Sequence, residues 1–509
     1  MFENQPKALY ALALANTGER FGYYTMIAVF SLFLRANFGL SGNTAGVIYG
    51  VFLALVYFLP LVGGIMADKF GYGKMVTIGI IVMFAGYLFL SIPLGGGVMG
   101  YAAMFGALLL VSLGTGLFKG NLQVMVGNLY DAPELSAKRD SGFSIFYMAI
   151  NIGALFAPTA AVRIKEWAEH SLGYSGNDAY HFSFAVACVS LIVSMMIYYA
   201  FRSTFKHVEA GAGKSKKTDT AGTEEELTPQ QTKERIVALC LVFAVVIFFW
   251  MSFHQNGLTL TFFADEFVNP KSEGVQTMAF DVINLVMIIF MIYSLMSFFQ
   301  SKTSKAKLIS TVVFLAAVGV LVYKYHNIGG PVDVSAPIFQ QFNPFYVVAL
   351  TPVSMAIFGA LAAKGKEPKA PRKIAYGMII AGSAYLLMVL ASRGLLTPNE
   401  QAAAKAAGET VPFASGNWLI GTYLILTFGE LLLSPMGISF VSKVAPPKYK
   451  GTMMGGWFVA TAIGNLLVSV GGFLWNDIPL TIVWSVFIVL CLLSAGFMFL
   501  MMKRLEKVA

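Results

Sequence analysis

The sequence predicts an all-α integral membrane protein with about fourteen spanning helices, arranged as two six-helix bundles plus two extra helices. The first reason is composition: 57% of the residues are hydrophobic and 12% are charged, about half the charged fraction of a soluble protein. The second reason is the length of the apolar runs, since about 20 apolar residues span a bilayer. Such runs must be helices, because a spanning segment has to satisfy its own backbone hydrogen bonds.

A polar segment near the middle of the chain divides the predicted spans into two sets. Residues 204–233 are rich in Lys, Thr, Glu and Gly and are too polar to bury, so we expect a solvated cytoplasmic linker. The N-terminal bundle, residues 1–203, holds predicted spans at 8–35, 44–66, 75–94, 101–129, 141–163 and 180–203. The C-terminal bundle, residues 234–509, holds predicted spans at 234–264, 279–300, 307–324, 337–362, 373–393, 415–441, 450–474 and 478–502.

The second set has two more spans than the first. We assign the extra pair to a helical hairpin at about 279–324, with a basic turn at Lys302–Lys307. Few polar residues besides Asp281 and Asn284 interrupt this hairpin, so we expect it to be peripheral rather than site-forming. Two six-helix sets joined by a linker are typical of transporters whose halves rock about a central site.

Lysine and arginine gather in alternate loops, and this pattern predicts the orientation of the chain. The basic loops, the linker and both termini share one side, which the positive-inside rule makes cytoplasmic. We therefore expect a multi-pass protein of the inner or plasma membrane without a cleaved signal peptide. The net charge of +9 lies in short loops and predicts no nucleic-acid partner. The three cysteines stand in apolar runs, so neither a disulfide nor a metal site is predicted.

A polar stretch interrupts the first span. On a helix, Asn16, Glu19, Arg20, Tyr23 and Tyr24 fall on a single face, and the opposite face is apolar. An ionised side chain at mid-membrane costs about 2.5–3.5 kcal/mol on insertion scales, so these residues must point inward. We expect a cavity wall, and the alternative is a neutralised Glu–Arg pair that only fixes helix packing.

Four further spans each carry a polar or ionisable side chain. Lys119 lies past the middle of its span, where the alternative to lining a cavity is snorkelling to the surface. For Asn151, the alternative to lining a cavity is a hydrogen bond that holds two helices together. His254 can titrate near neutral pH or can stay neutral as a packing residue. Glu430 has no cation within one helical turn, so its partner must come from another helix or from a ligand.

The segment from Gly63 to Lys74 reads Gly-Gly-Ile-Met-Ala-Asp-Lys-Phe-Gly-Tyr-Gly-Lys at the cytoplasmic end of the second span. Its glycines permit a tight turn, and Asp68 can cap a neighbouring helix or pair with a cation. The segment resembles the loop signature of the major facilitator superfamily. That resemblance implies a gating motif that does not touch substrate, formed by Gly64, Asp68, Lys69, Gly71 and Lys74.

Several ordered motifs together resemble the proton-dependent oligopeptide transporter family, a branch of the major facilitator superfamily. They are Glu19-Arg20-Phe-x-Tyr23-Tyr24, the Gly63–Lys74 loop, Phe146-Tyr147-x-x-Ile-Asn151-x-Gly153, Asn343-Pro344, Gly429–Pro435 and Trp457. The resemblance implies import of di- and tripeptides by proton symport with alternating access. It also implies no cofactor besides the coupling proton, and a chain that functions as a monomer in the lipid bilayer.

The same resemblance implies a site that grips both charged ends of a peptide. Arg20 and Lys119 meet the carboxylate, and Glu430 meets the amino group. The assisting residues are Asn151 and Asn343, and the side-chain pockets are lined by Tyr24, Tyr57 and Trp457. The candidates for proton coupling are Glu19, His254 and Glu430.

The chain departs from the family pattern at three positions. Asn16 stands where a Glu is usual, Ile27 where an Arg is frequent, and His254 where an acidic partner of that Arg is usual. An ion pair has thus been replaced as a unit, and His254 becomes a hypothetical carrier of the coupling proton. The extra hairpin is also displaced, because bacterial relatives usually carry two additional helices between the halves.

These departures keep an alternative open: the same fold moving another small anion or zwitterion, or moving peptides without protons. A receptor would need a large folded cytoplasmic domain, and the short linker offers none. No nucleophile–base set or metal cluster stands in the predicted membrane core, so an enzyme is not predicted. ATP drive is not predicted either, because no Gly-x-x-x-x-Gly-Lys-Ser/Thr loop occurs.

Overall fold

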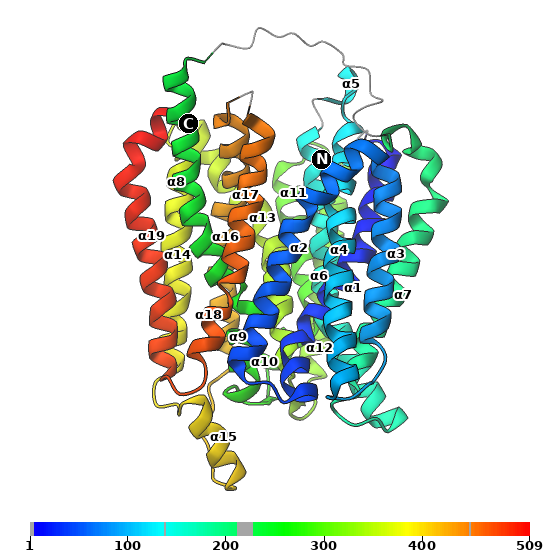
Figure 1. Cartoon of the computed structure of the whole chain (residues 1–509), viewed down its shortest axis with the longest axis vertical. Coiled ribbons are helices and arrows are strands. Elements are labelled where there is room, and N and C mark those ends of the chain that lie inside the picture. Colours follow the sequence, from blue (N-terminus) through cyan, green and yellow to red (C-terminus); the bar gives the residue numbers. More distant parts are fainter. Residues whose placement is uncertain (1–4, 137–138, 211–226, 447–448, 509) are drawn as a thin grey trace.

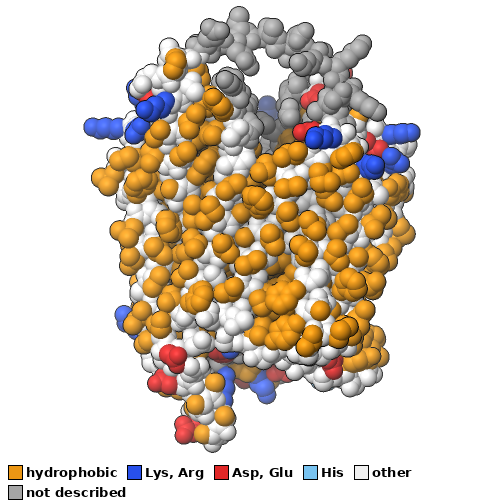
Figure 2. All heavy atoms as spheres, in the orientation of Figure 1, with side chains coloured by type: hydrophobic (Ala, Val, Ile, Leu, Met, Phe, Trp, Pro, Cys, Tyr) orange, Lys and Arg blue, Asp and Glu red, His pale blue; other side chains and the backbone are white. Residues whose placement is uncertain are grey.

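A computed structural model describes residues 5–136, 139–210, 227–446 and 449–508. The helices run roughly parallel to one another, and both ends of the chain lie at the same end of the molecule (Figure 1). The short helix α15, Pro398–Ala406, projects from the opposite end, which we call the α15 end. Hydrophobic side chains cover the middle of the visible face, whereas charged side chains gather toward the two ends (Figure 2). This distribution is that of a membrane-spanning protein.

Before the linker, the helices of the described chain are α1 Lys7–Phe38, α2 Gly42–Phe70, α3 Tyr72–Leu90, α4 Val98–Asn128, α5 Pro133–Ser136, α6 Arg139–Leu172 and α7 Tyr180–Ala200. Two 3₁₀ turns follow, η1 Arg202–Thr204 and η2 Lys206–Val208.

After the linker come α8 Pro229–Phe253, η3 His254–Gly257, α9 Thr259–Glu266, β1 Lys271–Ser272, α10 Gln276–Phe280, α11 Val282–Gln300, α12 Ser304–His326, β2 Val332–Asp333, η4 Ala336–Gln341, α13 Phe342–Ala363, α14 Ala370–Ala391, α15, α16 Asn417–Val444, α17 Lys450–Leu466, α18 Ser469–Leu474 and α19 Leu480–Val508. The strands β1 and β2 form one short antiparallel pair.

Thirteen helical segments in the described part of the chain are long and apolar enough to cross a membrane. Helix α1 has 32 residues and carries the polar stretch that lowers its hydropathy. Together with α1, these segments match the fourteen predicted spans one for one, so the predicted fold class is confirmed.

Two predicted spans are broken rather than continuous. The span predicted at 234–264 consists of α8, the 3₁₀ turn η3 and α9, and the span at 450–474 consists of α17 and α18. Gln255 joins the two breaks, because its side-chain amide donates to the Met251 carbonyl at 3.1 Å and to the Val468 carbonyl at 3.0 Å. A polar side chain thus satisfies carbonyls that a broken helix leaves free inside the membrane.

Helix α8 also begins earlier than predicted, within the segment 204–233 assigned to the linker. Thr228 and Gln231 form a capping box, in which each side chain satisfies the other residue's backbone amide. Pro229 stands at the first helical position, where it loses no intrahelical hydrogen bond. The local helix-start signal therefore overrides the polar composition of these residues.

The hairpin of α11 and α12 lies at the edge of the helix assembly, and most of its side chains are exposed toward the membrane. A polar contact attaches it to the bundle, since the Tyr293 hydroxyl donates to the Val348 carbonyl of α13 at 3.1 Å. The ion pair of Lys324 with Asp281 joins the two helices of the hairpin to each other. The expected peripheral position of the hairpin agrees with this placement.

Glycines bring α2 into backbone contact with α17 and α18 toward the α15 end. A Cβ atom added to Gly472 would lie 2.5 Å from the Gly42 carbonyl oxygen and 3.1 Å from the Gly46 Cα atom. One added to Gly50 would lie 2.8 Å from the Leu466 carbonyl oxygen. Small residues are what allow two membrane helices to approach so closely.

Candidate functional site

Helix α1 carries a buried ion pair. The Arg20 Nε and Nη2 atoms donate to the two carboxylate oxygens of Glu19, each at 2.5 Å, and the side chains are 3% and 0% exposed. The guanidinium carbon also lies 4.6 Å from the Tyr23 ring centroid. The structure therefore shows the neutralised pair that the sequence left as an alternative. Nη1 has no hydrogen-bonding partner among the described residues, so Arg20 keeps donors for a second acceptor.

Lys119 on α4 is a cation without a carboxylate beside it in the described parts of the chain. Its Nζ atom stands 4.0 Å from the centroid of the Tyr57 ring, which α2 contributes. A cation over an aromatic face is stabilised without being neutralised. Lys119 therefore retains its full capacity to meet an anion.

Glu430 on α16 is the carboxylate of the opposite half. Its Oε2 atom accepts a hydrogen bond of 2.9 Å from the Asn343 amide of α13, which also donates to the Thr427 hydroxyl at 3.0 Å. The side chain is 8% exposed, and no cation pairs with it within the described ranges. The sequence predicted a partner from another helix or from a ligand, and in the structure the Asn343 amide of another helix donates to this carboxylate.

Three tyrosines of the first half lie between these charges. Tyr24 on α1 and Tyr57 on α2 interact electrostatically with both Arg20 and Glu430. Tyr147 on α6 interacts with Glu430 and with the two other tyrosines. Its side chain is 46% exposed. Tyr24 and Tyr57 thus lie within electrostatic range of charged groups from both halves of the chain.

The sequence analysis quoted Tyr147 within a motif but did not assign it to the site. The signal was available, because Tyr147 stands four residues before Asn151 and shares its helix face. The Asn151 amide donates to the Tyr147 carbonyl at 3.1 Å, so in this structure it bonds to its own helix rather than joining two helices.

His254 lies at the start of the η3 turn, where α8 ends. Its Nδ1 atom is 2.6 Å from Oδ1 of Asn465 on α17, and its ring stacks on Trp250 with centroids 5.1 Å apart. The ring also lies 6.1 Å from that of Tyr57 in the opposite half. The sequence analysis missed Asn465, although a lone amide within an apolar span is the same signal that singled out Asn151.

Trp457 on α17 is packed among helices of the C-terminal half. It is 3% exposed, contacts the Phe243 ring at 6.5 Å between centroids, and lies where any side chain at Gly437 would collide with it. In this conformation the indole fills space between α8, α16 and α17, so its role in a side-chain pocket stays a prediction.

The loop between α2 and α3 differs from expectation in its contacts. Asp68 accepts a 2.7 Å hydrogen bond from the Tyr72 hydroxyl, so it neither caps α3 nor pairs with a cation among the residues described. Gly73 packs against Glu209, because a Cβ atom added to Gly73 would lie 2.6 Å from the Glu209 side chain. The loop therefore contacts the beginning of the linker, and the gating role of Gly64, Lys69, Gly71 and Lys74 stays a prediction.

Three polar contacts join the two halves at the α15 end. Arg35 of α1 forms an ion pair with Glu266 of α9, Thr159 donates to Gln341 at 3.0 Å, and Gln340 donates to the Ala28 carbonyl at 3.1 Å. With the glycine contacts of α2, these bonds seal this end of the molecule.

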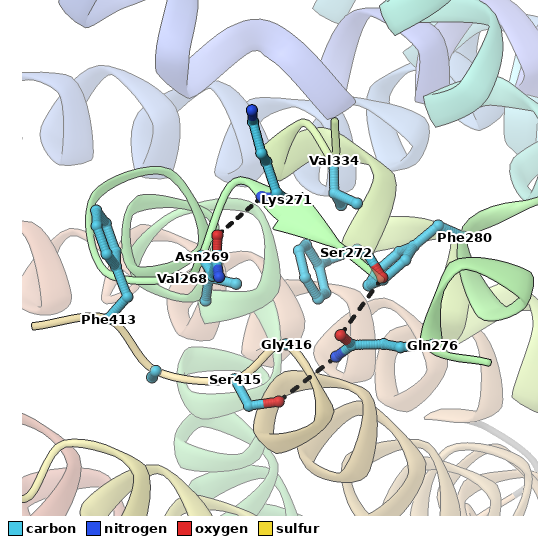
Figure 3. Close-up of a pocket in the computed structure, with 12 residues that line it drawn as sticks. Val268, Asn269, Lys271, Ser272, Gln276, Phe280, Val334, Phe413, Ser415 and Gly416 are labelled. Carbon is cyan, nitrogen blue, oxygen red and sulfur yellow. Dashed lines mark hydrogen bonds between the residues drawn. The ribbon is translucent and has the colours of Figure 1, made fainter. Parts of the chain in front are cut away.

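A cavity of about 270 Å³ lies outside this seal, beside β1, α10 and the start of α16 (Figure 3). Gln276 bridges it, with its amide oxygen 3.4 Å from the Ser272 hydroxyl and its nitrogen 3.5 Å from that of Ser415. No predicted site residue lines this cavity, so it is separate from the charged central site.

Comparison with known proteins gives the same family as the motifs. The chain matches the POT family over residues 73–222 and 324–483. It is 27% identical over 481 residues to the dipeptide and tripeptide permease B of Xenorhabdus bovienii, covering 92% of this chain and 86% of that protein. It is 29% identical over 497 residues to a di-/tripeptide transporter of Lactococcus lactis subsp. cremoris, covering 92% and 89%.

The fold is also similar to that of a peptide transporter POT crystallised with sulfate. The TM-score is 0.73, and the comparison covers 100% of this chain and 96% of that one at 22% sequence identity. The matched family segments make up more than half of the chain and include Lys119, Asn151, Asn343, Glu430 and Trp457. The chain therefore belongs to the POT family of membrane transporters.

Proposed function

We propose that this chain imports di- and tripeptides by proton symport, with alternating access between its two halves. One observation carries the proposal: Lys119 and Glu430 belong to opposite halves, and neither forms an ion pair with an opposite charge in the described structure. Tyr57, whose ring lies beside Lys119, is within electrostatic range of Glu430, and we place both charges in one central cavity. A short peptide is a zwitterion, and it supplies both missing charges. The names of the relatives, which are permeases and transporters of such peptides, point to the same substrate.

In this proposal the peptide carboxylate binds Lys119 and the free Nη1 donors of Arg20. Its amino group binds Glu430, which Asn343 holds in place through Oε2. Charge-assisted hydrogen bonds of this kind are roughly twice as strong as neutral ones, and a water-poor cavity strengthens them further. Because the two ends of the peptide bind different halves, the bound substrate favours closure around itself.

We place both termini and the linker in the cytoplasm of an inner or plasma membrane, as the basic loops indicate. The α15 end, where the two halves are bonded to each other, then faces outside, and the proposed central cavity opens toward the cytoplasm. The chain is proposed to act as a monomer, with the proton as coupling ion and no other cofactor.

A second candidate is peptide transport without proton coupling. It is favoured because uncharged side chains stand where the family usually has an ion pair. Ile27 is apolar and 7% exposed, and His254 is bonded to the uncharged amide of Asn465.

Purified protein in liposomes distinguishes these functions. Vesicles loaded with unlabelled dialanine are given labelled dialanine at equal pH, and empty vesicles are given it under an inward proton gradient. Exchange together with gradient-driven accumulation supports the peptide–proton symporter. Exchange without accumulation supports the uncoupled transporter, and absence of exchange refutes peptide transport by this chain. A Glu430→Gln variant must need a higher dialanine concentration for exchange, whereas Glu234→Gln at the cytoplasmic end of α8 must exchange normally.

A further inference from the structure

The contact between His254 and Asn465 fixes the chemistry of the imidazole. An amide oxygen only accepts hydrogen bonds, so the bond from Nδ1 to Asn465 Oδ1 requires that Nδ1 carries the hydrogen. In the neutral ring, Nε2 then holds the free lone pair. The ring is kept in place by Trp250, on which it stacks with an interplanar angle of 19°.

The two nitrogens of His254 differ in access. Nε2 has no hydrogen-bonding partner among the described residues, and it remains accessible to solvent. His181 on α7 shows the contrasting case: its Nδ1 is bonded to the Leu90 carbonyl, and its Nε2 is sealed from solvent without a partner. Only His254 of this pair can exchange a proton with the cavity.

The groups around His254 link this proton to the substrate. On α4, Lys119 is the charged group whose field reaches the ring, and Tyr57 on α2 stands between them. Three neutral tyrosines also pack at the helix break. Tyr49 lies against Gly257. Tyr423 donates to the Asn256 carbonyl, and Tyr385 donates to the Ser252 carbonyl. A proton on His254 repels Lys119, and a bound carboxylate removes that repulsion. Proton and peptide therefore favour each other's binding.

From this arrangement, and resting on the proposed function, we infer that Asn465 is a positioning residue for proton coupling. It holds His254 with its hydrogen on Nδ1 and leaves Nε2 to take up the coupling proton from the cavity. In the step, a hydronium ion transfers its proton to the Nε2 lone pair. One N–H bond forms, the Nδ1–H bond is kept, and the imidazolium carries the positive charge until water accepts the proton on the other side.

The test is the pH dependence of dialanine uptake by Asn465→Asp, with Asn327→Asp on the exposed end of α12 as the matched control. A carboxylate facing Nδ1–H stabilises the imidazolium, so the midpoint of proton-driven uptake should move to higher pH by about one unit or more. The control should show no shift. In a His254→Gln background, proton-driven accumulation should be absent with or without the Asn465→Asp substitution, because the titrating ring is gone.

Exchange at equal pH is measured for every variant, and it separates the two proposals. Loss of exchange by the unaltered chain contradicts the proposed function itself. Exchange with an unshifted midpoint in Asn465→Asp, or proton-driven accumulation that persists without His254, overturns the role of Asn465. If Asn465→Asp itself loses exchange, Asn465→Leu is used, which frees the ring. This variant should lose accumulation by at least about tenfold, and unchanged accumulation overturns the inference.

Discussion

At the scale of single residues, the central site contrasts paired and unpaired charges. Glu19 and Arg20 neutralise each other on adjacent positions of one helix, and their bidentate contact offsets part of the cost of burying two charges. Lys119 lies over an aromatic face and Glu430 accepts from an amide, and neither forms an ion pair among the described residues. Unpaired charges inside a membrane are costly, and their presence is therefore a mark of function.

Replacing Glu430 by Gln should lower the affinity for dialanine about 10- to 100-fold. The change removes a charge-assisted hydrogen bond of about 1.5–3 kcal/mol and keeps the shape of the side chain. Affinity is measured as the concentration dependence of exchange at equal pH. Glu234→Gln, which removes the carboxylate that pairs with Lys507 at the end of the molecule opposite α15, is the matched control and should bind normally. Equal affinity in both variants would exclude Glu430 as the amino-group ligand.

Replacing His254 by Gln should abolish proton-driven accumulation while exchange continues. Gln keeps a hydrogen-bonding side chain toward Asn465 but has no proton to gain near neutral pH. His326→Gln, at the end of α12, serves as the control and should accumulate peptide normally. Accumulation that survives in His254→Gln would assign the coupling proton to another group, with Glu19 and Glu430 as the next candidates.

At the scale of helices, the α15 end is sealed by contact of backbones. Gly46 and Gly472 let α2 and α18 meet without side chains between them, and Gln255 satisfies the carbonyls that the adjacent helix breaks expose. The breaks are also what bring His254 and Asn465 face to face, because each residue stands where its helix ends. The close packing of α2 against α18 and the contact between His254 and Asn465 thus both depend on these helix breaks.

Replacing Gly472 by Ala should destabilise the protein by about 1–3 kcal/mol, the usual cost of overpacking. Its Cβ atom would lie 2.5 Å from the Gly42 carbonyl oxygen, and neither backbone can move without opening the seal. The measurement is thermal unfolding in detergent together with dialanine exchange, which should fall as the closed outer end is lost. Gly319→Ala on α12, where a Cβ atom meets nothing within 4 Å, is the control and should be neutral or slightly stabilising. Equal effects of the two substitutions would show that the seal tolerates the added methyl group.

At the scale of the whole molecule, the proposed function assigns the two ends of a peptide to groups from different halves, with Lys119 in the first and Glu430 in the second. The halves are bonded to each other at the α15 end. In the proposed transport cycle, these three polar contacts break when the opposite end closes around a substrate.

The orientation can be tested with single cysteines in a chain whose Cys188, Cys240 and Cys491 have been replaced. A cysteine at Ala406 in α15 should react with a membrane-impermeant maleimide on intact cells, since that end is proposed to be outside. One at Ser304, in the basic hairpin turn, should react only after permeabilisation. Both positions are exposed, so the reverse pattern would invert the assignment.

The sequence by itself determined the membrane class, the number of spans, the side shared by both termini and most of the polar residues of the site. These follow from local properties, because an apolar run of sufficient length must span as a helix and an ionisable residue within it must face inward. The same reasoning identified Asn151 and Glu430 as buried polar groups before any contact was known.

Only the tertiary structure decided which of these residues meet. It paired Arg20 with its neighbour Glu19, joined Glu430 to Asn343 across 87 positions, and put Asn465 beside His254 across 211. It also broke two spans that read as continuous, because the amide of Gln255, which stands in the first interruption, donates to a carbonyl at each of them. The period of apolar residues along a helix indicates on which face a side chain lies. The identity of its partner depends on how separate helices pack, and no local pattern contains that information.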